Sequence, residues 1–118
     1  MKFFKCEDCG CILIADDAFV GKKLRELIPN TTDAAGEKHV PVAAVEGDKV
    51  QVTVGAVEHP MLEAHYITFV VLETSKGFQK QDLKPGEKPV AVFALAEGEK
   101  PLAVYEYCNL HGLWKAEI

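Results

Sequence analysis

The chain divides into a C-terminal part with regular apolar and polar alternation and an N-terminal part without it. The stretch "KVQVTV" (49–54) alternates strictly, which places Val50, Val52 and Val54 on one face of a half-buried strand. The stretch "HYITFVVLE" (65–73) is a longer apolar run rich in β-branched and aromatic residues, which also favours a strand. Further runs of this kind are "FQKQDL", "VAVFAL", "LAVYEYC" and "LWKAEI".

Segments rich in Gly and Pro separate these runs. The tripeptide "SKG" (75–77) predicts a hairpin turn, and "KPGEKP" (84–89) and "AEGEKP" (96–101) predict loops. About seven short strands divided by such turns predict an all-β protein, with the strands packed as an antiparallel β-sandwich.

Residues 1–36 follow no such pattern. They contain three clustered cysteines, then a Lys/Arg/Leu stretch, then "NTTDAAGE", whose composition predicts a loop. The stretch from Lys22 to Ile28 predicts a short helix with its three apolar residues on one face. We therefore expect two parts, a small N-terminal appendage over 1–36 and the sandwich over 37–118.

The composition is that of an ordinary globular protein. The chain has 118 residues, of which 48% are hydrophobic and 26% charged, which suffices for one domain with a core that needs no disulfides. No apolar run has the length of a membrane span, and the first residues are too soon polar for a signal peptide, so we predict a cytoplasmic protein. The net charge is −5 without a basic cluster, which argues against nucleic acid as a partner.

The cysteines and histidines suggest a metal. Cysteines stand at 6, 9, 11 and 108, a usage that in a cytoplasmic chain favours metal binding or catalysis over disulfides, although some can be small buried hydrophobes. A lone histidine in a loop is usually only solvated, but all four histidines lie in or beside loop segments. Because loops gather at the ends of a sandwich, we expect several of them to converge.

The spacing Cys-x-x-His at Cys108 and His111 strengthens this expectation, because one turn can offer a thiolate and an imidazole to the same ion. Zinc, copper and iron all accept such ligands. The four histidines and Cys108 make five candidate ligands, one more than a closed zinc site holds. Blue copper needs a methionine shortly after the turn, and none follows; Met61 is the only distant substitute.

Four motifs make the chain resemble the desulfoferrodoxin/neelaredoxin family of superoxide reductases. They are "EKHVP" (37–41), "HPMLEAHYI" (59–67), "LKPG" (83–86) and "YCNLHGLW" (107–114). They occur in the family's order, and the match runs from about Asn30 to the C-terminus.

The resemblance implies one mononuclear non-haem iron on an immunoglobulin-like β-sandwich. Four histidines lie around the iron equator in the family and a cysteine binds axially; the matching residues are His39, His59, His65, His111 and Cys108. Lys38 matches the family lysine that attracts superoxide and helps to supply protons, and Glu37 matches the glutamate that occupies the sixth position of oxidised iron. Read without the family, Lys38 and Glu37 are ordinary solvated charges.

The N-terminal segment departs from the family pattern. Many desulfoferrodoxins hold a second iron there, in a desulforedoxin-like site of four cysteines: a Cys-x-x-Cys and then an adjacent pair followed by glycine. Cys6 and Cys9 match the first pair, but Phe19-Val20, before Gly21, replace the second. We therefore predict a degenerate segment without the second iron. The alternative is zinc at Cys6, Cys9 and Cys11 with a fourth ligand from elsewhere.

The sequence thus predicts a superoxide reductase, which reduces superoxide to hydrogen peroxide by one electron. The resemblance implies a small electron donor such as rubredoxin and a homodimer or homotetramer. The alternative function is a non-catalytic electron-transfer or metal-binding protein that carries iron or copper on the same fold.

Overall fold

The computed structural model describes residues 1–15 and 23–118. Three strands precede the only helix of this part of the chain: β1 (Lys2–Cys6), β2 (Ile12–Ala15) and β3 (Leu24–Leu27). The helix is α1 (Gly36–His39). After it come β4 (Pro41–Glu46), β5 (Lys49–Val54), β6 (Ile67–Thr74), β7 (Gly77–Asp82), β8 (Val90–Ala94), β9 (Pro101–Cys108) and β10 (Gly112–Glu117).

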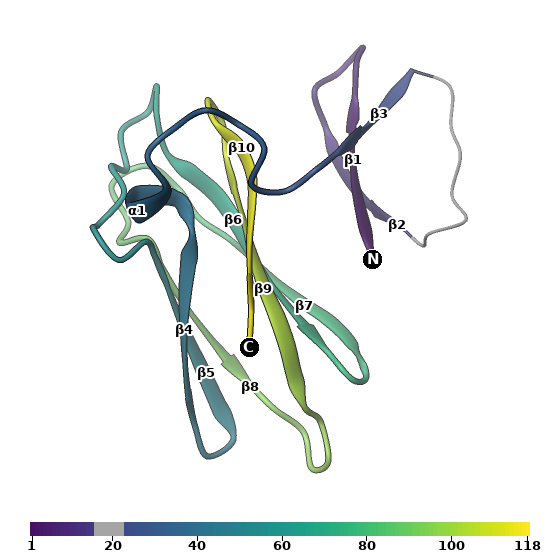
Figure 1. The fold of residues 1–118 in the computed structure, drawn as a ribbon, viewed down its shortest axis with the longest axis vertical. Helices are drawn as coiled ribbons and strands as arrows, with labels where there is room; N and C mark the ends of the chain where they lie inside the picture. Colours follow the sequence, from purple (N-terminus) through teal and green to yellow (C-terminus); the bar gives the residue numbers. More distant parts are fainter. Residues whose placement is uncertain (16–22) are drawn as a thin grey trace.

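Seven of these strands form a sandwich of two antiparallel sheets (Figure 1). One sheet has the order β10-β9-β6-β7 and the other β4-β5-β8. The predicted antiparallel β-sandwich is therefore confirmed. The hairpin predicted at "SKG" is also confirmed, since Thr74 pairs with Gly77 where β6 turns into β7.

Strands β6 and β9 are buried on both faces, which explains their continuous apolar sequences. On one face Val70, Leu72 and Val104 join the valines of β5 in the core between the two sheets. On the other face Phe69, Val71 and Tyr105 join a second core. A strand covered on both sides has no solvent face that would require alternating polar residues.

The second core lies between the sandwich and the N-terminal sheet, whose strand order is β2-β1-β3. Phe3 is 1% exposed and packs on Phe69 and Tyr105, with ring centroids 6.3 and 4.8 Å away. The helix predicted for Lys22–Ile28 is wrong in its described part, because Leu24–Leu27 is strand β3. Its backbone pairs with β1, and this pairing overrides a weak helical periodicity in so short a segment.

The division of the chain at residue 36 stays a prediction. It falls at the first residue of α1, after the N-terminal sheet. Phe19, Val20 and Gly21 lie outside the described residues. In the part of the chain that the structure describes, no helix is long and apolar enough to cross a membrane.

The register of β9 brings distant segments to one end of the sandwich. Cys108, the last residue of β9, pairs with Ile67 at the start of β6 and with Gly112 at the start of β10. Helix α1 and the loop between β5 and β6 lie at this same end (Figure 1). The loops that carry the candidate ligands therefore meet there.

The core between the sheets also encloses a carboxyl group. Glu106 on β9 is 0% exposed, and neither of its carboxylate oxygens has a hydrogen-bond partner among the described residues. Burial raises the pKa of Glu106 well above its ordinary value, because the charged form is poorly solvated there. The neutral acid is therefore the form that the fold favours.

This burial predicts a pH dependence of stability. Because the folded pKa of Glu106 is raised, its contribution is fully present below the ordinary pKa of 4.5 and is lost as the pH rises through the folded pKa. Glu106→Gln, which cannot ionise, should be more stable than the parent protein at pH 9 and should lose less stability between pH 6 and pH 9. Urea unfolding of both proteins in the same metal state measures this. Parallel stability curves would contradict it.

Candidate metal centre

The five predicted ligands lie together, and each comes from a different position in the fold. His39 ends α1, His59 and His65 lie in the loop between β5 and β6, Cys108 ends β9, and His111 lies in the β9–β10 turn. His39, His59 and Cys108 are at most 2% exposed, whereas His65 and His111 are partly exposed. The cluster therefore has a buried side and a side that opens to solvent.

The four imidazole rings form a square. Neighbouring ring centroids are 4.6, 4.7, 5.0 and 4.9 Å apart around the circuit His39, His59, His65, His111 and back to His39. Each ring stands edge-on to the next, with interplanar angles between 74° and 87°. Across the diagonal, His39 and His65 are 6.4 Å apart. Such an arrangement gives four nitrogens a common centre.

Backbone carbonyls fix the proton positions of two rings. His39 Nδ1 donates to the Ala35 carbonyl at 2.7 Å, and His59 Nδ1 donates to the Pro60 carbonyl at 2.6 Å. A carbonyl only accepts, so each neutral ring has its proton on Nδ1 and a bare lone pair on Nε2. The two Nε2 atoms are nevertheless only 3.1 Å apart. Lone pairs held this close without a proton between them repel, and a cation between them would remove the repulsion.

The remaining donor atoms point to the same cation. His65 Nε2 is buried and has no hydrogen-bond partner among the described residues. His111 Nδ1 lies 3.1 Å from His39 Nε2, and Cys108 Sγ lies 3.6 Å from His59 Nε2. One ligand atom from each of His39, His65, Cys108 and His111 falls within 4.8 Å of the others. Imidazole nitrogens and one sulfur are donors suited to a transition metal.

Burial favours the neutral form of three imidazoles of the cluster. Burial is the main cause that lowers the pKa of His39, His59 and His65, and it lowers that of His59 to about 4. Their lone pairs are therefore free at neutral pH. Burial raises the pKa of Cys108, and the backbone N–H groups of Leu110 and His111 lower it in part. Those amides are placed to stabilise a thiolate once a cation displaces the thiol proton.

The rim of the cluster carries exposed charges from α1. Lys38 lowers the pKa of both His39 and His65 through its charge, so it lies near both rings. The neighbouring Glu37 acts on His39 in the opposite direction. The sulfur of Met61 accepts the backbone N–H of Ile67 at 3.4 Å.

The three N-terminal cysteines form no comparable cluster among the described residues. All are free thiols; Cys6 is half-buried, and Cys9 and Cys11 are exposed. The backbone N–H of Cys9 donates to Cys6 Sγ at 3.4 Å across the turn.

Sequence reasoning missed two residues that support the cluster. Trp114 stacks on His39 with ring centroids 5.0 Å apart, and its Nε1 donates to the His111 carbonyl at 3.1 Å. Its place in "YCNLHGLW" was the available signal. The other is Gly55, which no motif contains.

The chain is similar to proteins of known kind over nearly its whole length. The sequence profile of the Desulfoferrodoxin family matches residues 31–117. A desulfoferrodoxin of Syntrophotalea carbinolica is 45% identical over an alignment of 123 positions, which covers 99% of this chain and 96% of the relative. The superoxide reductase of Treponema pallidum has a solved structure with a TM-score of 0.83 and 39% identity, covering 98% of this chain and 97% of that one. The 1Fe superoxide reductase of Giardia intestinalis gives a TM-score of 0.60 and 36% identity, covering 70% and 97%.

Gly55 lies directly against the backbone that presents His39. A Cβ added to Gly55 would lie 2.7 Å from the Glu37 carbonyl oxygen and 2.8 Å from the Lys38 carbonyl carbon. Both atoms are backbone, so a side chain at this position would push α1 away from the cluster.

Gly55→Ala should therefore weaken metal retention and stability together. We expect a loss of about 1–3 kcal/mol in the free energy of unfolding and faster loss of metal to a chelator. Gly36→Ala, in α1 itself, is the matched control, since an added Cβ there meets nothing within 4 Å. Urea unfolding and chelator competition measure both effects. If both variants had the same free energy of unfolding and the same rate of metal loss, the contact at Gly55 would not hold α1 in place.

Proposed function

The chain belongs to the desulfoferrodoxin family, and from this premise we propose that it is a superoxide reductase. It reduces superoxide by one electron to hydrogen peroxide at a single iron site. The observation that carries this conclusion is the square of imidazoles with bare nitrogens facing one another beside a buried thiol. We propose that five residues hold the iron, namely His39, His59, His65, His111 and Cys108.

The donor set fits the metal. Imidazole and thiolate ligands suit iron, and five ligands leave a sixth position for substrate. When iron is bound, it supplies the electron that reduces superoxide, and two protons complete hydrogen peroxide. The thiolate of Cys108 would add negative charge on the buried side of the centre, and this charge would favour release of the reduced oxygen species.

The other residues hold and protect the centre. The carbonyls of Ala35 and Pro60 fix the rings of His39 and His59, so their nitrogens are pre-positioned. Trp114 covers one face of His39. We propose that Lys38 attracts superoxide through its charge and that its Nζ helps to supply protons. We propose that Glu37 occupies the sixth position when the iron is oxidised.

Further proposals concern the partners. We propose a small redox protein such as rubredoxin as the electron donor, and a homodimer or homotetramer as the assembly. For the N-terminal segment we propose that no second iron is bound, because two apolar residues stand where two thiolates would be needed. The competing proposal is zinc held by Cys6, Cys9 and Cys11 with a fourth ligand from elsewhere.

Metal analysis tests these proposals together. Protein purified without oxygen should contain about one iron per chain and should consume superoxide with formation of peroxide but not of dioxygen. A variant with Cys6, Cys9 and Cys11 all replaced by Ser should keep its metal content and activity. Loss of zinc from that variant would instead support the zinc alternative. Copper as the only tightly held metal, with no turnover of superoxide, would favour the electron-carrier function.

The role of Lys38 predicts a rate that depends on salt. Lys38→Ala should slow the second-order reaction with superoxide by about tenfold at low ionic strength, while iron content stays unchanged. The difference should shrink as salt rises, because exposed charges are screened. Lys49→Ala, at the far end of β5, is the matched control and should react like the parent protein. Pulse radiolysis over a range of salt concentrations measures these rates; equal rates for Lys38→Ala and Lys49→Ala at low salt would remove Lys38 from the mechanism.

A further inference from the structure

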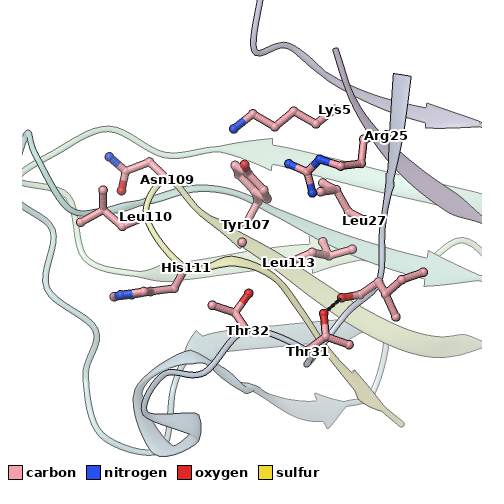
Figure 2. Close-up of a pocket in the computed structure, with 12 residues that line it drawn as sticks. Lys5, Arg25, Leu27, Thr31, Thr32, Tyr107, Asn109, Leu110, His111 and Leu113 are labelled. Atoms are coloured by element: carbon pink, nitrogen blue, oxygen red, sulfur yellow. Dashed lines mark hydrogen bonds between the residues drawn. The ribbon is translucent and has the colours of Figure 1, made fainter. Parts of the chain in front are cut away.

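A cavity of about 220 Å³ lies between the N-terminal sheet and the β9–β10 turn (Figure 2). Lys5 and Arg25 line it from the N-terminal sheet, and Thr31 and Thr32 line it from the linker after β3. Tyr107 and His111 contribute the wall on the sandwich side. Polar groups from three separate segments therefore converge on one cavity that is open to solvent, and no Asp or Glu of the described residues lines it.

The two cations are direct neighbours across the sheet. Lys5 on β1 pairs with Arg25 on β3, two residues along from the pair Phe3 and Leu27. Side chains two residues apart share a face of a strand, so these cations lie on the face that packs Phe3 and Leu27 against the sandwich. Like charges directly opposite each other destabilise a sheet. This face thus carries two like charges side by side, Lys5 half-buried and Arg25 exposed, and an anion between them would compensate their repulsion.

Protein groups compensate these cations only in part. Among the described residues, Lys5 has no ion pair. Arg25 uses its Nε to contact Glu7 at 2.9 Å, in an exposed pair whose side chains are 57% and 52% accessible. Among residues 1–15 and 23–118, the terminal amino groups of the guanidinium have no hydrogen-bond partner, and these are the groups that bind oxyanions in pairs.

Neutral donors complete the site. Tyr107 is 8% exposed, lines the cavity, and its hydroxyl has no hydrogen-bond partner among the described residues. The Thr32 hydroxyl likewise makes no hydrogen bond within the described chain, whereas Thr31 donates to the Ile28 carbonyl at 2.7 Å. Hydroxyls that line a cavity and have no partner on the protein can donate to the acceptor oxygens of a ligand.

We propose that this cavity binds a phosphate group, either as inorganic phosphate or on a small phosphate monoester. A phosphate offers two negative charges to Lys5 and Arg25 and further oxygens to Tyr107 and Thr32. The site is local, because the chain as a whole has a net charge of −5 and does not attract anions by its overall field. It does not depend on the proposed superoxide reduction, since neither cation belongs to the metal centre.

The bound phosphate would tie the N-terminal sheet to the sandwich. One set of its contacts comes from β1 and β3 and the other from Tyr107 and the linker. Ligand binding to the folded state alone raises stability with concentration. The proposal therefore predicts a saturable rise of the unfolding temperature with phosphate, beyond any rise caused by chloride at equal ionic strength.

The test compares the iron-loaded full chain with Lys5→Gln and with Lys2→Gln. Lys2 lies on the same strand and instead pairs with Glu26 at 3.7 Å, so Lys2→Gln controls for the loss of charge. Isothermal titration with inorganic phosphate and with glycerol 3-phosphate measures the dissociation constants. Lys5→Gln should weaken phosphate binding by about tenfold or more, and Lys2→Gln should leave it unchanged.

The difference in unfolding temperature between Lys5→Gln and the parent protein gives a second test, because phosphate should reverse its sign. Without phosphate, Lys5→Gln removes a repulsion and should unfold at the same or a higher temperature than the parent protein. In saturating phosphate the parent protein should unfold at the higher temperature. If only inorganic phosphate binds, the ligand is the free ion. If glycerol 3-phosphate also binds, the ligand is the phosphate group of a small monoester. Absence of saturable binding of either ligand, or equal affinity in Lys5→Gln, would overturn the proposal.

Discussion

The approach of bare imidazole nitrogens is the interaction on which the rest of this structure depends. His39 Nε2 and His59 Nε2 lie 3.1 Å apart, and the carbonyl bonds to their Nδ1 atoms leave no proton to place between them. Such repulsion is sustained only if the backbone behind each ring is held in place. The fold supplies that support: α1 packs on Gly55 through its backbone, and the segment around His59 is tied back to β5 by the hydrogen bond from the His59 N–H to the Val54 carbonyl at 3.1 Å. The backbone thus holds the two nitrogens close enough to repel each other, and a bound cation would relieve this repulsion.

Strand β9 links this centre to the core. It is buried on both faces, and it ends at Cys108, so the proposed sulfur ligand stands at the end of a well-packed strand of the sandwich. The turn that follows then brings His111 back to the same centre. A ligand on a rigid element keeps its position better than one on a free loop, which suits an electron transfer that requires little rearrangement. The partly exposed His65 and His111 leave the opposite side accessible to a small anion.

The N-terminal sheet has a face of mixed character. Phe3 and Leu27 attach it to the sandwich through a shared apolar core, while Lys5 and Arg25 extend the same face toward the β9–β10 turn. The apolar half explains why the segment stays attached even though its cysteines do not match a four-cysteine metal site. Glu7 compensates the cationic half only in part, and the proposed oxyanion would compensate the remaining charge. Attachment and ligand binding are then two uses of one surface.

The sequence alone predicted most strands of the sandwich and the candidate residues of the centre. Strict alternation such as that of Val50, Val52 and Val54 reports burial directly, and short motifs that resemble a known family supplied the proposed ligands. Tertiary structure decided the rest. Leu24–Leu27 became a strand because β1 offered backbone partners, a contact that local propensity does not encode. The square of rings, the close packing at Gly55 and the cationic cavity likewise depend on segments far apart in the chain, whose distances in space are set only when the sheets pack.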